Sequence, residues 1–372
     1  MAASQSPMSD IRPCTADDMY AVARMFQREF RDKRRPAPAS LESYLRELFL
    51  EHPWRDSETE SRVFVGPDSK VRGFIGVLPI RMSFHGKPVR AALASSLVVE
   101  NPSENPMAGA RLLRSYLTGP QDLCVSETSN PTAQGMWERI GGSAIPDYSM
   151  EWLRVMRPAG FGVAMVTEKI AAAKLVRPIA SLVDRFVARI AKNPFQRPEM
   201  PAGLYSDADV NDDVLLDQIP HFAKNYALHP DWNRESLAFF LRHAEQKDRH
   251  GKLFCRMVYG RAKTPVGCYL YYGRPGDIAW VLQILALPEA TDAVIANLIA
   301  HADALGCVAV RGRTQPQLLN SLLRHRCVLF QRSSTTVYSK DPDLLAAIRS
   351  GDALIIGLAG EGWTRLIGQQ FV

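Results

Sequence analysis

The 372-residue sequence has no apolar run approaching about 18 uncharged residues, and none of its six cysteines forms a CxxC pair. Without such an apolar run, we expect no membrane-spanning helix. The isolated cysteines have no histidine cluster beside them, which argues against metal sites, structural zinc included, and against a disulfide framework. The first ten residues also lack the basic head and apolar centre of an export signal. We therefore expect a cytoplasmic protein with reduced, mostly buried thiols.

The charge balance is mildly basic rather than extreme. The formal net charge is +6 and the isoelectric point about 9.0, while 46% of the residues are hydrophobic and 23% are charged. Such a composition is typical of a globular chain of two or three domains. It fits an anionic partner, such as a nucleotide cofactor or an acidic membrane face. No alternation of aromatic and basic residues indicates a nucleic-acid platform, so no nucleic-acid partner is expected.

The first half follows the order of a layered α+β domain. A short strand and two helices precede two apolar hairpins, the second turning at His85-Gly86-Lys87. A helix over 108–117, a strand at "DLCVSE" and a helix over 132–140 complete the order. Helices on a mixed sheet are the expected outcome. We place the boundary of this first domain at 1–158.

A basic stretch separates the first domain from a second one that repeats the same order of elements. Residues 159–200 are expected to form an amphipathic helical connector, in which the helical stretch 163–192 is interrupted at Pro178. This stretch fits two roles: packing between domains, or peripheral contact with a membrane surface. Residues 201–372 form the second domain, in which "TTVYS" and "DALIIGLAG" are expected as closing strands. The shared order indicates an ancient duplication.

The stretch "NPTAQGMWERIGG" resembles the strand-to-helix segment that follows the fifth strand in GNAT-superfamily acyltransferases. Family members commonly carry an Asn, an Ala three residues later, and an aromatic-Glu-Lys/Arg-x-Gly-Phe tail. Here these places are filled by Asn130, Ala133, Trp137, Glu138, Arg139, Gly141 and Gly142. The whole chain resembles a tandem acyltransferase with a degenerate second copy. The resemblance implies two GNAT-like domains, each a mixed, mostly antiparallel sheet with a splayed parallel strand pair between helices.

The same resemblance implies a site for acetyl-CoA or another acyl-CoA as co-substrate. The family binds the pyrophosphate at a loop of Gln/Arg, two residues, Gly, one residue, Gly/Ala, where backbone N–H groups of a helix start are offered. In "ENPSENPMAGARLL" this register places Asn105, Ala108 and Ala110, with Gly109 between the last two. The backbone near Val98 and Val99 would polarise the thioester carbonyl. The family's cation is missing from this loop, and Pro106 removes one donor.

The resemblance also leaves the proton chemistry open. Many family members have Tyr at the place of Trp137 as a general acid, whereas an indole N–H only donates hydrogen bonds. Trp137 is therefore either a donor to the leaving thiolate or a core residue. Tyr148 could supply the proton in its place. Glu100 and Glu127, each at the end of a predicted strand, are the candidate bases, and a solvated carboxylate is the alternative for both.

Two functions follow for testing. The first is an acyl-CoA-dependent N-acyltransferase, which moves an acetyl or other acyl group to the amine of a small metabolite, amino sugar or lipid precursor by direct attack on the thioester. The second is a non-catalytic GNAT-like binding or scaffold protein at a membrane surface. The three small residues at 108–110 favour the enzyme. Neither the acceptor nor the acyl length nor the oligomeric state follows from the sequence.

Overall fold

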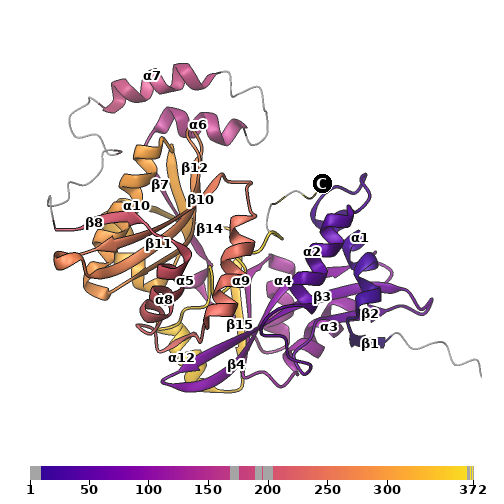
Figure 1. Ribbon diagram of the computed structural model, residues 1–372. Coiled ribbons are helices and arrows are strands. Elements are labelled where there is room, and N and C mark those ends of the chain that lie inside the picture. The colour runs from indigo at the N-terminus through magenta and orange to yellow at the C-terminus, as the bar shows by residue number, and fades with distance from the viewer. Residues whose placement is uncertain are drawn as a thin grey trace, which may run out of the picture. The chain divides into compact units, whose positions relative to one another are not determined.

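The structure is a computed structural model that describes residues 10–167, 176–188, 195, 204–366, 369 and 371 (Figure 1). The chain divides into two compact units, each containing one mixed sheet with helices. Unit 1 comprises Met1–Pro146, Ser333–Ser350 and Gln370–Val372, and unit 2 comprises Asp147–Arg332 and Gly351–Gln369. The predicted α+β class, with two domains that each hold one mixed sheet, is confirmed.

The sheet of unit 1 runs in the order β1-β2-β3-β4-β5-β15-β6. Its strands are β1 (Asp10–Pro13), β2 (Arg62–Val65), β3 (Val71–Phe84), β4 (Lys87–Val99), β5 (Leu123–Ser129), β6 (Ser143–Ala144) and β15 (Ser334–Ser339). The helices of this unit are α1 (Met19–Phe30), α2 (Ala39–Leu50), α3 (Ala108–Leu117), α4 (Pro131–Arg139) and α12 (Pro342–Arg349). The expected hairpin turn joins β3 to β4, with positive φ at His85 (48°) and Gly86 (80°).

Helices cover both faces of this sheet. Alternate residues of β3 separate the faces: Ile75 and Val77 pack with α3, whereas the Phe74 ring meets Phe49 of α2 at 5.3 Å. Leu112 of α3 is fully buried in the first of these layers. A strand that buries apolar side chains on both faces must lie in the middle of the domain. β3 and β4 therefore form the rigid centre on which the candidate site is built.

The sheet of unit 2 runs in the order β14-β7-β13-β12-β11-β10-β8. Its strands are β7 (Met150–Val155), β8 (Ser206–Asp209), β10 (Lys252–Tyr259), β11 (Pro265–Gly273), β12 (Ile278–Ala286), β13 (Ala309–Arg313) and β14 (Val328–Gln331); β9 (Leu228–Pro230) also belongs to this unit. Its helices are α6 (Pro158–Thr167), α7 (Arg177–Ala188), α8 (Asp212–Ala223), α9 (Arg234–Glu245), α10 (Thr291–Leu305) and α11 (Leu319–Arg324); α5 (Pro146–Ser149) begins at the unit boundary.

The units do not follow the boundaries expected at 158 and 200. β7, which lies before residue 158, pairs with β13 and β14, and Trp152 is fully buried in the core of unit 2. β15 lies in the expected second domain but belongs to unit 1, where it pairs with β5 and β6. Strands adjacent in sequence are neighbours in space only about two-thirds of the time. The sequence pattern shows that a strand exists, but not which sheet it joins.

Two further expectations change. Pro178 does not interrupt a helix, because it lies in the first turn of α7, where its missing N–H costs nothing. Much of the connector 159–200 lies outside the described residues. The segment "DALIIGLAG" is not a strand: it is buried and irregular, and Gly357 has a φ of +70° that a strand residue does not adopt. In the described part of the chain, no helix is both long and apolar enough to span a membrane.

Candidate acyl-CoA site

The central feature of unit 1 is a parallel strand pair that opens partway along its length. β4 and β5 are paired only through Ala91↔Leu123, Ala92↔Cys124 and Leu93↔Val125, whereas β15 pairs with β5 from Leu123 to Ser129. Ser95 is an extra residue in β4, since Gly76 pairs with Ser96 and Val77 with Ala94. A bulge of this kind bends the strand and re-aims its backbone. From Ala94 onward the edge of β4 that faces β5 is therefore free of strand partners among the described residues.

The backbone groups that face this gap follow from the hydrogen-bond alternation. The Glu100 amide donates to the Arg72 carbonyl at 2.7 Å, so Glu100 belongs to the set that bonds to β3. Alternate residues of an antiparallel strand turn their N–H and C=O groups to opposite sides. The amide of Val98 accordingly points at β3, and those of Leu97 and Val99 point into the gap. Of the two residues predicted to polarise the thioester carbonyl, Val99 has the suitable direction.

Tyr116 of α3 lies where the two strands part. The Val125 amide donates to its hydroxyl at 3.2 Å, and the hydroxyl donates to the Ala92 carbonyl at 2.5 Å. A phenol thus bridges two strands where a direct ladder bond would otherwise form. Complete burial raises the pKa of Tyr116 well above its usual value, so the hydroxyl stays protonated. The sequence gives one hint, because a tyrosine within an apolar helix face needs a partner for its hydroxyl.

The start of α3 follows the freed end of β4. Ala108 is 2% exposed and packs in the core, and its amide donates to the Asn105 carbonyl at 3.1 Å. Neither Gly109 nor Ala110 has an amide acceptor among the residues that the structure describes, and the N-cap Met107 offers no side-chain cap. These two amides are the groups that a helix start offers to an anion.

Gly109 has no packing reason within the fold. A Cβ built on it would come no nearer than 3.6 Å to any neighbour, the sulfur of Met136, and its φ is not in the left-handed region. An alanine would fit there, so packing does not require a glycine at this position. The open space beside Gly109 adjoins the two amides that lack an acceptor among the described residues. Arg111, one residue beyond Ala110, is exposed and is a cation that the loop register had missed. Its guanidinium lies 5.5 Å from the Phe64 ring.

The stretch that carries the resemblance is chiefly architectural. Asn130 caps α4 by accepting the Ala133 amide at 2.9 Å, and Pro131 occupies the first turn. Gly141 ends the helix with a φ of +100°, which favours glycine. Trp137 is 2% exposed and meets the ring of Tyr116 edge-on at 6.0 Å. Of its two predicted alternatives, the core role is the one this packing supports.

The two carboxylates have different surroundings. Glu100 is held by two arginines, with Arg28 of α1 at 2.9 Å and Arg72 of β3 at 2.6 Å, one on each oxygen. These two ion pairs engage both oxygens of the carboxylate. Glu127 is 1% exposed on β5, two residues beyond Val125, the last residue of β5 that pairs with β4. It lies where the pairing of β5 with β15 is irregular, since Thr336 pairs with Ser126 and Ser334 with Ser129.

Tyr148 is placed in unit 2. Its hydroxyl donates to the Ala353 carbonyl at 2.6 Å, and the side chain is fully buried. Burial raises its pKa far above the usual value, which makes it a reluctant proton donor. The described contacts give Tyr148 a structural role in unit 2.

Unit 2 has a similar opened pair, but its gap is filled by the chain itself. β12 and β13 pair in parallel up to Trp280↔Arg311, and the extra residue of β12 is Leu282. The bulge follows the last pair by two residues, as Ser95 follows Leu93 in unit 1. Beyond it, Gly357 lies against the Leu282 carbonyl, and the Leu358 amide donates to the Gln283 side chain at 3.0 Å. These contacts occupy the edge of β12 that a ligand would need.

Comparisons with known proteins identify the fold. No protein-family model matches the chain, and no curated protein matches it in sequence. A GCN5-related N-acetyltransferase from Anabaena variabilis ATCC 29413 superposes with a TM-score of 0.57 at 12% identity, over 90% of this chain and 74% of that one. One from Kribbella flavida gives 0.54 at 12% identity, over 92% and 73%. A probable N-acyltransferase from Enterococcus faecalis V583 gives 0.57 at 12% identity, over 89% and 73%. The chain has the two-domain GNAT-like fold.

Proposed function

We propose that the protein is an acyl-CoA-dependent N-acyltransferase whose donor site lies in unit 1. The observation that carries the proposal is the freed edge of β4 together with two uncapped amides at the start of α3, the next helix along the chain. The strand edge offers hydrogen-bonding groups to an extended amide chain such as pantetheine. The helix start offers N–H groups and a positive dipole end to a pyrophosphate. The pantetheine arm of coenzyme A is thus matched by the edge of β4, and its pyrophosphate by the start of α3.

The residues present fit an acyl thioester at this place. Val99 directs its amide into the gap, where it can donate to the thioester carbonyl and stabilise the oxyanion as negative charge develops. Gly109 leaves room beside the bare amides. Acetyl-CoA is the simplest donor, and a longer acyl group would need additional apolar volume.

Glu127 is the base that best fits the arrangement. An ammonium acceptor must lose a proton before its nitrogen can attack the thioester carbon. Glu127 takes this first proton, and the neutral nitrogen attacks the thioester carbon to form the C–N bond. The nitrogen then loses its second proton to solvent as the C–S bond breaks, and solvent protonates the coenzyme A thiolate that leaves. Glu100 is excluded from this role by its two arginines. The acceptor is an amine of a small metabolite, amino sugar or lipid precursor.

The test is a calorimetric titration with acetyl-CoA and free CoA of the wild-type protein and two variants of Ala110. Ala110→Glu places an acid in the first turn of α3, where it favours the helix but repels a pyrophosphate. Ala110→Gln has nearly the same size without the charge. Wild-type and Ala110→Gln proteins should bind, and Ala110→Glu should bind at least about tenfold more weakly. Equal affinities of the two variants for CoA would show that the pyrophosphate does not bind at the start of α3.

A non-catalytic GNAT-like binding or scaffold protein is the second candidate. It is favoured by Trp137, whose ring is buried in the core where a proton-donating tyrosine would serve catalysis. The two functions separate in a thiol-release assay with acetyl-CoA and a panel of primary amines. Amine-dependent release of free CoA supports the enzyme. Saturable CoA binding without release for any amine supports the scaffold.

A further inference from the structure

The helix α7 turns its apolar stripe away from the protein. Ile179, Leu182 and Val183 are 63%, 54% and 46% exposed, and their spacing of three and four residues places them on one face. The apolar stripe of a surface helix normally faces the core. Here the inward positions are Ala180 and Asp184, which are 6% and 8% exposed. The helix is amphipathic, with its polarity reversed relative to the body of unit 2.

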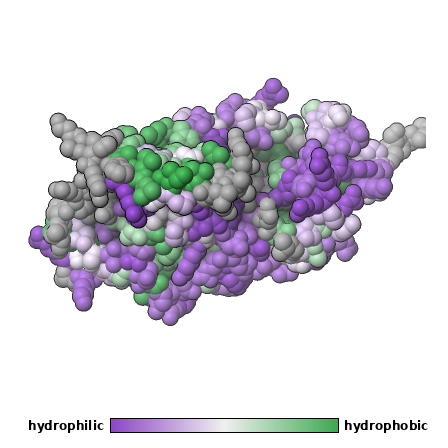
Figure 2. Space-filling model, turned by 90° about the horizontal axis from the view of Figure 1, so that it is seen from above, coloured by the Kyte–Doolittle hydropathy of each residue, from purple (hydrophilic) through white to green (hydrophobic). Residues whose placement is uncertain are grey.

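The neighbouring helix extends the same surface. α6 packs against α7 and exposes Met165 (41%) and Val166 (48%), while Val176 just before α7 is 46% exposed. In Figure 2 these helices carry a green, hydrophobic patch on the face that is turned to the viewer. Contiguous patches of this kind mark interaction sites rather than ordinary surface.

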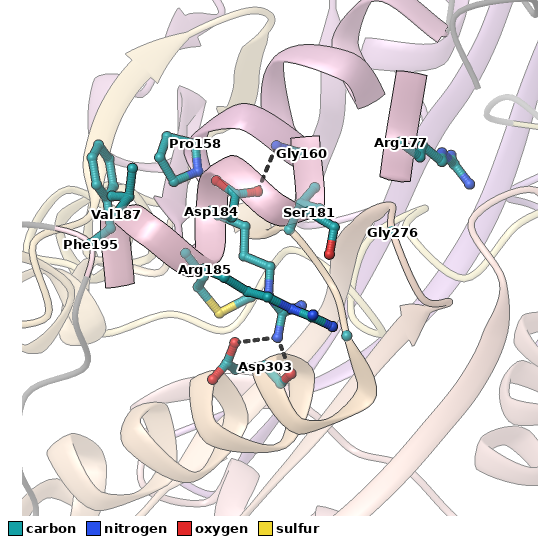
Figure 3. A pocket seen from close by; sticks show the side chains of 14 residues that line it. Pro158, Gly160, Arg177, Ser181, Asp184, Arg185, Val187, Phe195, Gly276 and Asp303 are labelled. Atoms are coloured by element: carbon teal, nitrogen blue, oxygen red, sulfur yellow. Dashed lines mark hydrogen bonds and ion pairs between the residues drawn. The ribbon is translucent and has the colours of Figure 1, made fainter. Parts of the chain in front are cut away.

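Polar groups of this helix pair are directed inward instead. Both oxygens of Asp184 accept backbone amides at the start of α6, from Ala159 and Gly160 at 2.8 Å each. Figure 3 shows the bond to Gly160. Arg177 forms an ion pair with Asp277 at 2.5 Å. Asp184 is the one acidic residue in the described parts of α6 and α7, and its carboxylate is hydrogen-bonded beneath the patch. The outer surface therefore carries no described carboxylate of these helices.

The charge of the surrounding sequence points to the partner. Residues 163–192 contain six cations and two acids, a net charge of +4, and Asp184 and the ion-paired Arg177 are both directed inward. Arg185 is exposed beside the stripe. Several of the other cations lie outside the described residues, and only their charge enters here. Apolar side chains bordered by cations match the acyl boundary and headgroups of a bilayer that contains anionic lipid.

We propose that α6 and α7 form a docking surface for an anionic membrane. The exposed side chains of Ile179, Leu182 and Val183 enter the boundary between headgroups and acyl chains, and the exposed Arg185 meets the lipid phosphates. A protein partner is less suited, because a face of small aliphatic side chains without polar groups lacks the aromatic anchors and hydrogen bonds of a specific interface. The inference does not depend on the acyltransferase activity.

The test is co-sedimentation of the full chain with vesicles of phosphatidylcholine alone or mixed with phosphatidylglycerol. The wild-type protein should sediment with the mixed vesicles at least about tenfold more strongly than with the neutral ones, and added salt should weaken the association. Leu182→Asp should lose it. The matched control is Leu323→Asp in α11, which is equally exposed at 55% and should sediment like the wild type. Arg185→Gln should reduce the salt dependence.

Three results would overturn the proposal. These are equal sedimentation of Leu182→Asp and wild type, binding to neutral vesicles as strong as to acidic ones, and no binding to either. Light scattering of the protein without lipid tests whether the patch instead binds a second copy of the chain. A dimer that Leu182→Asp dissociates in the absence of lipid would assign the patch to self-association and reject the membrane. Circular dichroism melts of all variants confirm that the changes at these exposed positions leave the fold intact.

Discussion

The hydroxyl of Tyr116 accepts a hydrogen bond from the backbone amide of Val125 at 3.2 Å, in the layer where β4 and β5 begin to diverge. Its own proton goes to the carbonyl of Ala92 on the facing strand. One side chain of α3 therefore satisfies a donor and an acceptor that would otherwise bond to each other across the pair. The opening of the strands is built into the core rather than left to a mobile loop.

Replacing Tyr116 by Phe should lower both stability and donor binding. Two buried backbone groups lose their shared partner, which costs about 1–3 kcal/mol in the free energy of unfolding, and the strands can then close by a direct bond. Urea unfolding and acetyl-CoA titration measure the two effects. Tyr272→Phe is the control, since Tyr272 donates to the Ala244 carbonyl in unit 2 and should affect stability alone. Unchanged acetyl-CoA affinity in Tyr116→Phe would contradict this role.

The two carboxylates should respond differently to amide substitution. Glu127→Gln removes the proposed base and should lower kcat by about 100-fold or more, with little change in KM for acetyl-CoA. Glu100→Gln loses charge-assisted bonds to Arg28 and Arg72 and should destabilise the protein by about 1–3 kcal/mol while kcat stays within a few-fold. Steady-state kinetics with the best amine, together with unfolding curves, distinguish the pair. The reverse pattern would make Glu100 the base.

Trp137→Phe tests whether the indole N–H takes part in the chemistry. The ring packs in the core against Tyr116, and phenylalanine keeps an aromatic contact while removing the donor. We expect moderate loss of stability, about 1–3 kcal/mol, and a kcat within about threefold of wild type. A loss of kcat of about 100-fold with the fold intact would instead show that the indole stabilises the leaving thiolate.

Gly357→Ala tests the contacts that fill the opened pair of unit 2. Its φ of +70° disfavours any side chain, and an added Cβ would collide with the Leu282 carbonyl. We expect destabilisation of unit 2 by more than about 1 kcal/mol and no change in acetyl-CoA affinity. Gly86→Ala, at a position with positive φ where an added Cβ meets nothing within 4 Å, controls for backbone strain. Altered binding in Gly357→Ala alone would implicate unit 2 in donor binding.

The sequence pattern predicted individual helices and turns better than it predicted which strands pair with one another. Helix 108–117 and the turn at His85-Gly86 follow from spacing and glycine chemistry, and the structure has both. The exchange of β7 and β15 between sheets was missed, because alternation does not say which sheet edge a strand will meet.

At the candidate site, the surroundings of the predicted residues came from the structure and not from the sequence. Ala108 is a core residue, and the bare amides belong to Gly109 and Ala110. The arginines on Glu100 come from positions 28 and 72, and Ala353 meets Tyr148 from 205 residues away. Contacts of such sequence separation leave no trace in a local pattern. Tyr116 was predicted as part of a helix, but its place between two strands required the three-dimensional packing.

Hydrogen exchange of backbone amides, measured with and without saturating acetyl-CoA, tests the central claim most directly. The proposal predicts slower exchange at Leu97 and Val99 on the freed edge of β4, and at Gly109 and Ala110 at the start of α3, with the opened pair of unit 2 unchanged. Protection at β12 and α10 instead, or no protection anywhere at saturation, would contradict a donor site in unit 1.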